Sequence, residues 1–303
     1  MVEKYNDLKM ILAIAAGLVL APPAFAADPA QEQKADTAIA EVPGGDIFGF
    51  TSGTDVGKVG DHGGGIEFDG SYGARGGSLK VLSQKYFYER VIAPNTTLGL
   101  GVFTAWHSVR NVPAEPINRS DFQFDGLSFE IGHRLIERSA TNPFAVKIAL
   151  EPRWARLTGG GRHTNAYGGE LKFFVDAAVV PGKLYWAGNL VFDYGVERDP
   201  EMKTKYSRGS GLKLSNALSW QFSEALFAGV EVTWLAAFDG FYGKYAGQAV
   251  FAGPTLYWKF AKNASLNLTV APQLAGRAKG VPMTLDLDNF ERAVSRVKLA
   301  VDF

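Results

Sequence analysis

The sequence predicts an all-β protein, a closed antiparallel transmembrane β-barrel of about twelve strands. Apolar and polar residues alternate over most of the chain after Gly45, which is the period-two pattern of strands with two different faces. The alternating segments are about 9–15 residues long, close to the length that a tilted strand needs to cross a bilayer. The connections between them are alternately short and long, as in barrels with short periplasmic turns and longer outer loops.

Composition agrees with this fold and excludes some functions. The chain has 303 residues, with 31 basic and 31 acidic side chains, and no cysteine. A zero formal charge argues against a nucleic-acid-binding protein, which normally carries a basic excess. Without cysteine the chain has neither disulfides nor thiolate metal sites. The average hydrophobicity suits a barrel in which a polar interior dilutes an apolar outer surface.

The N-terminus predicts export. The stretch "LKMILAIAAGLVLAPPAFAADPA" has a short apolar core that ends at Leu20, followed by Ala24-Phe25-Ala26. This is the pattern of a secretory signal peptide, residues 1–26, with an A-x-A cleavage site. Its apolar run is shorter than the roughly 20 residues of a membrane-spanning helix. We therefore expect an outer-membrane protein whose mature chain starts at Ala27.

Residues 27–63 are expected to be a periplasmic leader and N-terminal segment outside the main ladder. Residues 27–44 are polar and rich in Ala and Pro, as flexible linkers are. Residues 47–52 resemble a strand, but a thirteenth strand would place the two chain ends on opposite sides of the membrane. We therefore interpret this stretch as a periplasmic or lumen-facing segment. It is too short for a large plug domain.

The barrel itself is expected over residues 64–303. Its first strand, 64–75, contains the alternating "IEFDGSY", whereas in the second, 78–92, the parity is unclear around "SQKYFYER". The other ten have apolar residues at alternate positions, as Phe144, Val146, Ile148 and Leu150 illustrate. They are 98–106, 127–135, 144–154, 171–179, 184–194, 212–222, 226–238, 250–260, 266–274 and 297–303.

The connections give an independent indication of the topology. Five are short, at 93–96, 138–142, 180–183, 223–224 and 261–263. The alternate connections near 110–121, 157–166, 197–210, 239–247 and 277–290 are longer and rich in Gly, Pro and charge, whereas the first, near 75–77, is short. With an even number of strands, both chain ends lie on the side of the short turns, which we expect to be the periplasm.

The polar faces of these strands predict a charged lumen. Acidic and basic residues alternate with the apolar ones, so that they would point inward if the apolar face contacts lipid. The lumen-lining candidates are Glu130, Arg134, Lys147, Glu151, Arg153, Glu170, Lys172, Asp193, Lys213, Glu231, Arg296 and Lys298. A soluble barrel or sandwich would reverse the two faces. Tryptophans near the ends of the apolar faces, as in an interfacial girdle, favour the membrane alternative.

The last strand carries the most specific signal. The chain ends "RVKLAVDF", in which Val297, Leu299, Val301 and Phe303 occupy alternate positions. This ending resembles the C-terminal assembly signal of Gram-negative outer-membrane β-barrels. The resemblance implies that the barrel-assembly machinery is a partner and that the last strand pairs with the first. The phrases "FGFTSGTDVG", "EPRW", "AGPTLY" and "NFERAVSRVKLAVDF" also resemble an uncharacterised family of such barrels.

The sequence supports a channel more than an enzyme. The four histidines are far apart, and His107 and Ser108 cannot form a dyad because adjacent strand residues point to opposite faces. We expect no catalytic residue, metal or cofactor, and no nucleic-acid partner; outer-membrane lipid surrounds the barrel. The function expected is a passive, narrow channel for small polar solutes, without an identified solute. The alternative is a non-conducting structural or surface-binding barrel, and an outer-membrane enzyme is a third, weaker possibility.

Overall fold

The structure is a computed structural model that describes residues 47–113, 115, 117–139 and 142–303. The expected signal peptide, residues 1–26, and the first part of the 27–63 segment lie outside the described residues. Among those described, no helix is long and apolar enough to cross a membrane.

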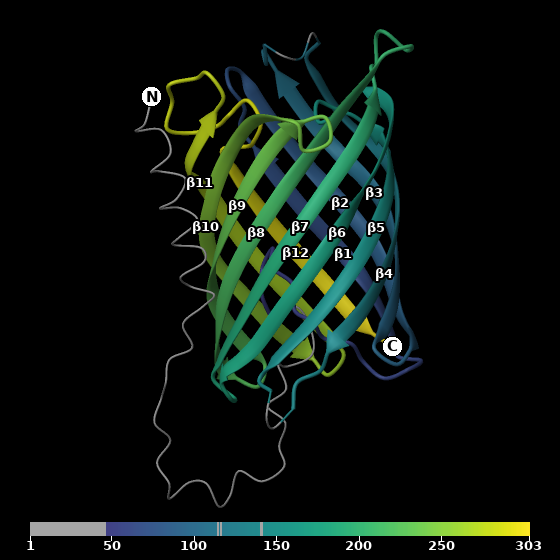
Figure 1. Ribbon diagram of the computed structural model, residues 1–303, viewed down its shortest axis with the longest axis vertical. Coiled ribbons are helices and arrows are strands. Elements are labelled where there is room, and N and C mark those ends of the chain that lie inside the picture. The colour runs from purple at the N-terminus through teal and green to yellow at the C-terminus, as the bar shows by residue number, and fades with distance from the viewer. Residues whose placement is uncertain (1–46, 114, 116, 140–141) are drawn as a thin grey trace, which may run out of the picture. The chain divides into compact units, whose positions relative to one another are not determined.

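Twelve antiparallel strands form one closed barrel, as Figure 1 shows. Each strand pairs with its neighbours in sequence, and β1 pairs with β12 to close the sheet. This confirms the predicted fold class and strand number. The strands are β1 (His62–Tyr72), β2 (Ser78–Ala93), β3 (Thr96–Arg110), β4 (Arg119–Ile136), β5 (Phe144–Leu157), β6 (His163–Val180), β7 (Leu184–Arg198), β8 (Tyr206–Ser223), β9 (Leu226–Asp239), β10 (Lys244–Ala261), β11 (Ala264–Ala278) and β12 (Ala293–Asp302).

The closing pair joins the first and last strands in matched register. Ile66 lies opposite Leu299 and Phe68 opposite Val297, so the apolar positions of β1 and β12 match in register. The amide of Phe303 donates a hydrogen bond of 2.9 Å to the His62 carbonyl. Because β12 has a neighbour on each side, the last strand leaves no open edge.

Several strands extend further than the sequence predicts. β4, β6, β8 and β10 each contain 18 residues, and β8 begins at Tyr206 rather than near residue 212. The additional residues lie at the end with the longer connections, here called the long-loop end; the opposite end is the short-turn end. The alternation of apolar residues on the outer face ends where a strand leaves the apolar belt, whereas backbone hydrogen bonding continues beyond it. The expected loop near 197–210 is therefore only 199–205 in the structure.

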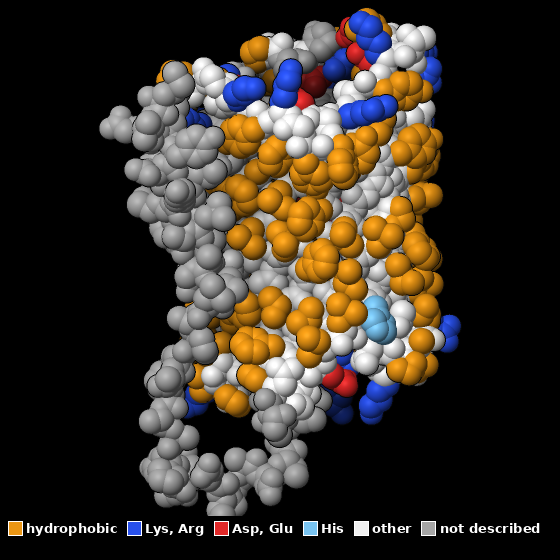
Figure 2. Space-filling view, in the orientation of Figure 1, with side chains coloured by type: hydrophobic (Ala, Val, Ile, Leu, Met, Phe, Trp, Pro, Cys, Tyr) orange, Lys and Arg blue, Asp and Glu red, His pale blue; other side chains and the backbone are white. Residues whose placement is uncertain are grey.

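The two faces of the wall differ as predicted. Apolar side chains such as Leu100, Val230 and Leu274 are exposed on the outside of the wall. Figure 2 shows a belt of hydrophobic side chains around the face in view. Inward positions of the same sheet carry small or polar residues, and Ala187 and Ser215 are completely buried. Complete burial of inward-facing side chains means that other residues of the chain occupy part of the lumen. That filling is the N-terminal segment described below.

The face assignment predicts how an added charge affects the barrel. Val102 points outward from β3, whereas Ser83 shares the inward parity of Lys85 on the adjacent β2. We expect Val102→Arg to destabilise the folded barrel by about 2–4 kcal/mol, because the charge enters hydrocarbon. Ser83→Arg should cost much less, because its inward position, opposite Asp69, faces the polar lumen. Urea unfolding of both variants in lipid vesicles measures the difference, and equal losses would reverse our face assignment.

Candidate functional site

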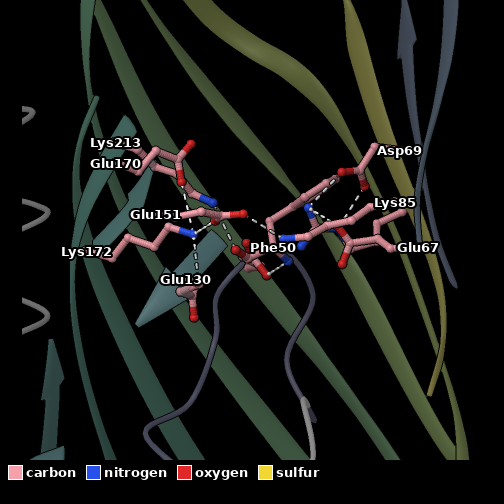
Figure 3. A network of polar contacts seen from close by, with 11 residues as sticks. Phe50, Glu67, Asp69, Lys85, Glu130, Glu151, Glu170, Lys172 and Lys213 are labelled. Carbon is pink, nitrogen blue, oxygen red and sulfur yellow. Dashed lines mark hydrogen bonds and ion pairs between the residues drawn. The ribbon is translucent and has the colours of Figure 1, made fainter. Parts of the chain in front are cut away.

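The middle of the lumen contains a network of charged side chains centred on Lys172 (Figure 3). The Lys172 ammonium lies 3.0 Å from Glu130 and 3.1 Å from Glu170, and it also pairs with Glu151. These residues come from β4, β5 and β6, and their side chains share the inward face. One cation therefore holds three carboxylates that would otherwise repel one another.

Glu151 is the most deeply buried acid of this network. Its side chain is 7% exposed, and it accepts bonds from Lys85 at 3.0 Å and Ser128 at 2.7 Å in addition to Lys172. An isolated carboxylate at such a site would be unstable because burial removes its hydration. The two cations and the hydroxyl replace that hydration, so Glu151 depends on its neighbours to remain charged.

A second ion-pair group lies on β1 and β12. The Arg296 guanidinium makes a two-bond contact with Asp69, at 2.8 and 2.9 Å, and lies 3.1 Å from Glu67. The Asp69 contact crosses the seam that closes the barrel, where Asp69 and Arg296 are paired in register. The same guanidinium lies 5.0 Å from the centre of the Phe50 ring, within range of a cation–π interaction. This group therefore connects the closing strands to the N-terminal segment.

Residues 47–54 lie inside the lumen, whereas residues 55–61 reach the short-turn end, where Lys58 and Asp61 are exposed. Ile47, Thr51 and Thr54 are completely buried by the wall. Ile47 and Phe48 pack near the short-turn end against Tyr185 and other inward residues of β6–β10. Phe50 reaches the charged network in Figure 3. The segment is much shorter than a plug domain, yet it fills the short-turn half of the interior.

The wall recognises the backbone of this segment more than its side chains. Asn189 holds both the amide and the carbonyl of Ser52, and Lys213 and Glu231 do the same for Phe50. The contacts are Ser52 N to Asn189 Oδ1 (2.7 Å), Asn189 Nδ2 to Ser52 O (2.8 Å), Phe50 N to Glu231 Oε2 (2.8 Å), Lys213 Nζ to Phe50 O (2.9 Å), Thr54 N to Asp176 Oδ2 (2.6 Å), Ser219 Oγ to Ile47 O (3.1 Å) and Asn267 Nδ2 to Phe48 O.

Close contact with the wall constrains the sequence of the segment. A Cβ atom at Gly49 would overlap the Thr269 hydroxyl and crowd the Glu231 carboxylate. Only glycine lets the backbone approach β9 and β11 this closely. The "FGF" of the segment therefore places two aromatic rings around one point of close approach.

The loop at 279–292 folds into the opposite, long-loop end of the lumen. Gln273 anchors it, donating to the carbonyls of Asp286 and Glu291 and accepting from the Asp286 amide at 2.7 Å. Phe290 of this loop and Phe50 of the N-terminal segment pack against the same cluster that contains Phe251. Burial raises the pKa of the Glu291 carboxyl, although hydrogen bonds from its own amide and Ser71 oppose the rise.

The remaining predicted lumen residues lie outside the Lys172 network. Lys147 lies 6.0 Å from the Phe174 ring centre and Lys298 lies 5.0 Å from that of Phe87. Arg153 pairs with Asp125 at 2.7 Å, and the Asp193 carboxylate lies over Gly211. Arg134 is near the short-turn end, where it donates to Asn95 and pairs with Glu137. The roles of these residues in a lumen remain predictions.

The sequence missed several members of the site. Lys85 lies in "SQKYFYER", where Tyr86 and Tyr88 point outward but Phe87 points inward. Because aromatic residues occur on both faces of this strand, the sequence pattern does not reveal which residues face the lumen. Arg138, which pairs with the completely buried Asp176, follows the last residues of β4 and resembles a turn residue. Among the described residues, no group of three His, Asp or Glu side chains is arranged to hold a metal.

Comparison with known proteins places the chain by family and fold. The model of a family described as "Family of unknown function (DUF6662)" matches residues 40–303. No curated protein matches the chain. The COG4313 outer membrane channel from Pseudomonas putida F1 has a similar fold, with a TM-score of 0.57, 11% identity, and coverage of 82% of this chain and 98% of that one.

Two other solved structures are more distant. The translocator domain of the autotransporter NalP from Neisseria meningitidis has a TM-score of 0.47 and 10% identity, covering 81% of this chain and 90% of that one. The NanC porin has a TM-score of 0.44 and 10% identity, covering 78% and 98% respectively.

The Lys172 network predicts that loss of Lys172 lowers the stability of the barrel more than loss of an exposed ion pair does. Lys172→Met should destabilise the barrel by about 3–5 kcal/mol, because three carboxylates lose a shared, mostly buried cation. Adding Glu151→Gln should recover part of this loss, because it removes the most buried carboxylate, which would keep only Lys85 of its two cations. Glu137→Gln, which breaks an ion pair with a largely exposed acid, should cost less than about 1 kcal/mol. Guanidinium unfolding measures all three, and similar losses for Lys172→Met and Glu137→Gln would contradict the assignment.

Proposed function

The chain belongs to the family described as "Family of unknown function (DUF6662)", and we propose that it is an outer-membrane channel for small polar solutes. One observation carries this proposal. In the middle of a closed wall, charged side chains remain accessible to water: Glu170 is 46% exposed, Arg153 40% and Asp69 37%. A barrel filled only for stability would bury these groups. The similar fold described as an outer membrane channel supports the proposal.

The N-terminal segment sets the width of this channel. On the long-loop side of Phe50 the lumen presents the accessible charges, whereas on the short-turn side Phe48, Tyr185 and Phe227 are at most 2% exposed. A continuous aqueous path therefore requires the segment to shift from its site. Its polar contacts with the wall are mostly hydrogen bonds to backbone, which water can replace when the segment leaves. Both signs of charge face the lumen, so the charge selectivity of the channel is modest.

A non-conducting barrel is the second candidate, and the same packing favours it. Thr51, Asp176 and Ser215 are completely buried between the segment and the wall. If that packing is permanent, the segment is part of the barrel interior and the loops carry the function. The two candidates differ in one measurable property, which is whether conductance depends on the freedom of the segment.

A disulfide can test that dependence directly. The Thr51 hydroxyl lies 2.9 Å from that of Ser215, and the chain has no cysteine of its own. The variant Thr51→Cys/Ser215→Cys should therefore form one defined disulfide that fixes the segment to β8. In planar bilayers we expect single-channel steps from the reduced variant and their loss on oxidation. Mobility on a gel without reductant checks that the bond has formed.

Single-cysteine variants are the matched controls. Thr51→Cys and Ser215→Cys alone should conduct equally in both redox states, because neither can form the bond. Equal conductance of the reduced and oxidised double variant would refute the gating role of the segment. A barrel that is silent in every state, including after weakening of the segment site by Asn189→Ala, would favour the non-conducting alternative.

We also propose that the protein is exported with cleavage after Ala26 and inserted in the outer membrane, with the long-loop end outside. The proposed assembly signal is Val297, Leu299, Val301 and Phe303, and the proposed partner is the barrel-assembly machinery. Phe303 suits this role because its side chain is 72% exposed beyond the end of β12. Its ring stacks on His62 at 5.7 Å between centroids, at the seam of the barrel.

Phe303→Ala should separate assembly from stability. The exposed ring contributes little packing, so the variant should refold in detergent almost as well as the wild type. In cells, its amount in the outer-membrane fraction should fall several-fold if the aromatic terminus is recognised during assembly. Phe222→Ala removes a similarly exposed aromatic ring, 65% exposed, and should leave that amount unchanged. An equal fall for both variants would argue against the terminal signal.

A further inference from the structure

The two ends of the barrel differ in exposed charge. Within the described residues, ten exposed bases lie at the long-loop end, against three exposed acids, Glu201, Asp239 and Asp288. The bases are Lys80, Arg110, Arg156, Lys203, Lys205, Arg208, Lys244, Arg277, Lys279 and Arg292. The short-turn end is balanced, with Lys58, Arg90, Lys183, Lys259 and Lys262 against Asp55, Asp61, Glu137, Glu224 and Asp302. Figure 2 shows Lys and Arg side chains above the upper edge of the apolar belt.

Five of these bases form a rim directly beyond the belt. Strand alternation puts these bases on the outer face of the barrel. Each lies two or four residues nearer to the long loops than an outward apolar residue of the same strand. Examples are Lys80 beyond Leu82 on β2, Arg110 beyond Trp106 on β3 and Arg156 beyond Trp154 on β5. Arg208 and Arg277 occupy corresponding places on β8 and β11. The basic rim is Lys80, Arg110, Arg156, Arg208 and Arg277.

The rim bases lack the partners that charges in the lumen have. Within the described part of the chain, none of the five forms an ion pair, whereas Lys172 pairs with three carboxylates and Arg296 with two. Four of the five are arginines, whose planar guanidinium matches the geometry of a phosphate group. A ring of unpaired guanidinium groups at an apolar boundary is thus open to a phosphate that comes with an acyl chain.

We propose that the basic rim binds the phosphate-bearing head groups of lipids in the leaflet around the long-loop end. The acyl chains of such a lipid would lie along the apolar belt while its phosphates contact the rim, so one molecule satisfies both surfaces. A free phosphate would use only half of this arrangement. Basic residues near a membrane surface strengthen the binding of anionic lipid, so removal of all five rim bases should weaken that binding about tenfold or more.

The experiment uses the mature chain folded in a non-ionic detergent. The probe is an acylated glucosamine disaccharide with two phosphates, and its dephosphorylated form is the control lipid. Native mass spectrometry measures the affinity of each lipid for the wild type and for the rim variant Lys80→Gln/Arg110→Gln/Arg156→Gln/Arg208→Gln/Arg277→Gln. The matched variant is Lys58→Gln/Arg90→Gln/Lys183→Gln/Lys259→Gln/Lys262→Gln, which removes five charges from the other end.

We expect the rim variant to bind the phosphorylated lipid at least about tenfold more weakly, and the matched variant to bind it like the wild type. Replacing the four rim arginines by lysine, which keeps the charge, should retain most of the binding and establishes that the barrel tolerates substitution there. Equal weakening in both five-site variants would refute the proposal, because net charge alone would then explain it. Tight binding of the dephosphorylated lipid, or displacement by millimolar inorganic phosphate, would also refute it. None of these outcomes depends on whether the barrel conducts.

Discussion

Pairing of β1 with β12 is the constraint on which the rest of this structure depends. A strand surrounded by lipid has no water to satisfy its backbone groups, so the sheet must close on itself. Closure requires the first and last strands to match in register, and Ile66 opposite Leu299 and Asp69 opposite Arg296 provide that match on the two faces. The outer pair contributes apolar surface to the belt, while the inner pair forms an ion pair at the seam.

Closure also determines how charge is distributed inside. Once the apolar residues face outward, the intervening charges of every strand converge on a confined lumen. They are stable there because most have a partner of opposite sign, as Lys172 has in Glu130, Glu151 and Glu170. The N-terminal segment uses the same groups, since Lys213 and Glu231 hold the backbone of Phe50. The lumen is therefore both an ionic network and a binding site for a segment of its own chain.

Outside the lumen, charge follows a different rule. At the long-loop end, Arg110, Arg208 and other exposed bases have no carboxylate partner within the described structure, although the whole chain carries equal numbers of acids and bases. Among the described residues, many of the acids are instead buried or paired inside the lumen, as Glu130, Glu151 and Asp69 are. Net charge is thus a poor guide to the surface of a barrel, because its two faces and its two ends are electrostatically separate.

The alternation of Val297, Leu299 and Val301, and of similar residues in the other strands, was enough to predict twelve antiparallel strands, their faces and the closed topology. This succeeds because the period of a strand is local and every strand has one apolar, outward face. The partners of the charges could not be predicted, because Lys85, Glu151 and Lys172 are brought together only by the curvature and register of the barrel. Nor could the position of residues 47–61, whose contacts with Asn189, Lys213 and Glu231 lie more than a hundred residues away in sequence. Local pattern determined the wall of this protein, and only tertiary structure decided what fills it.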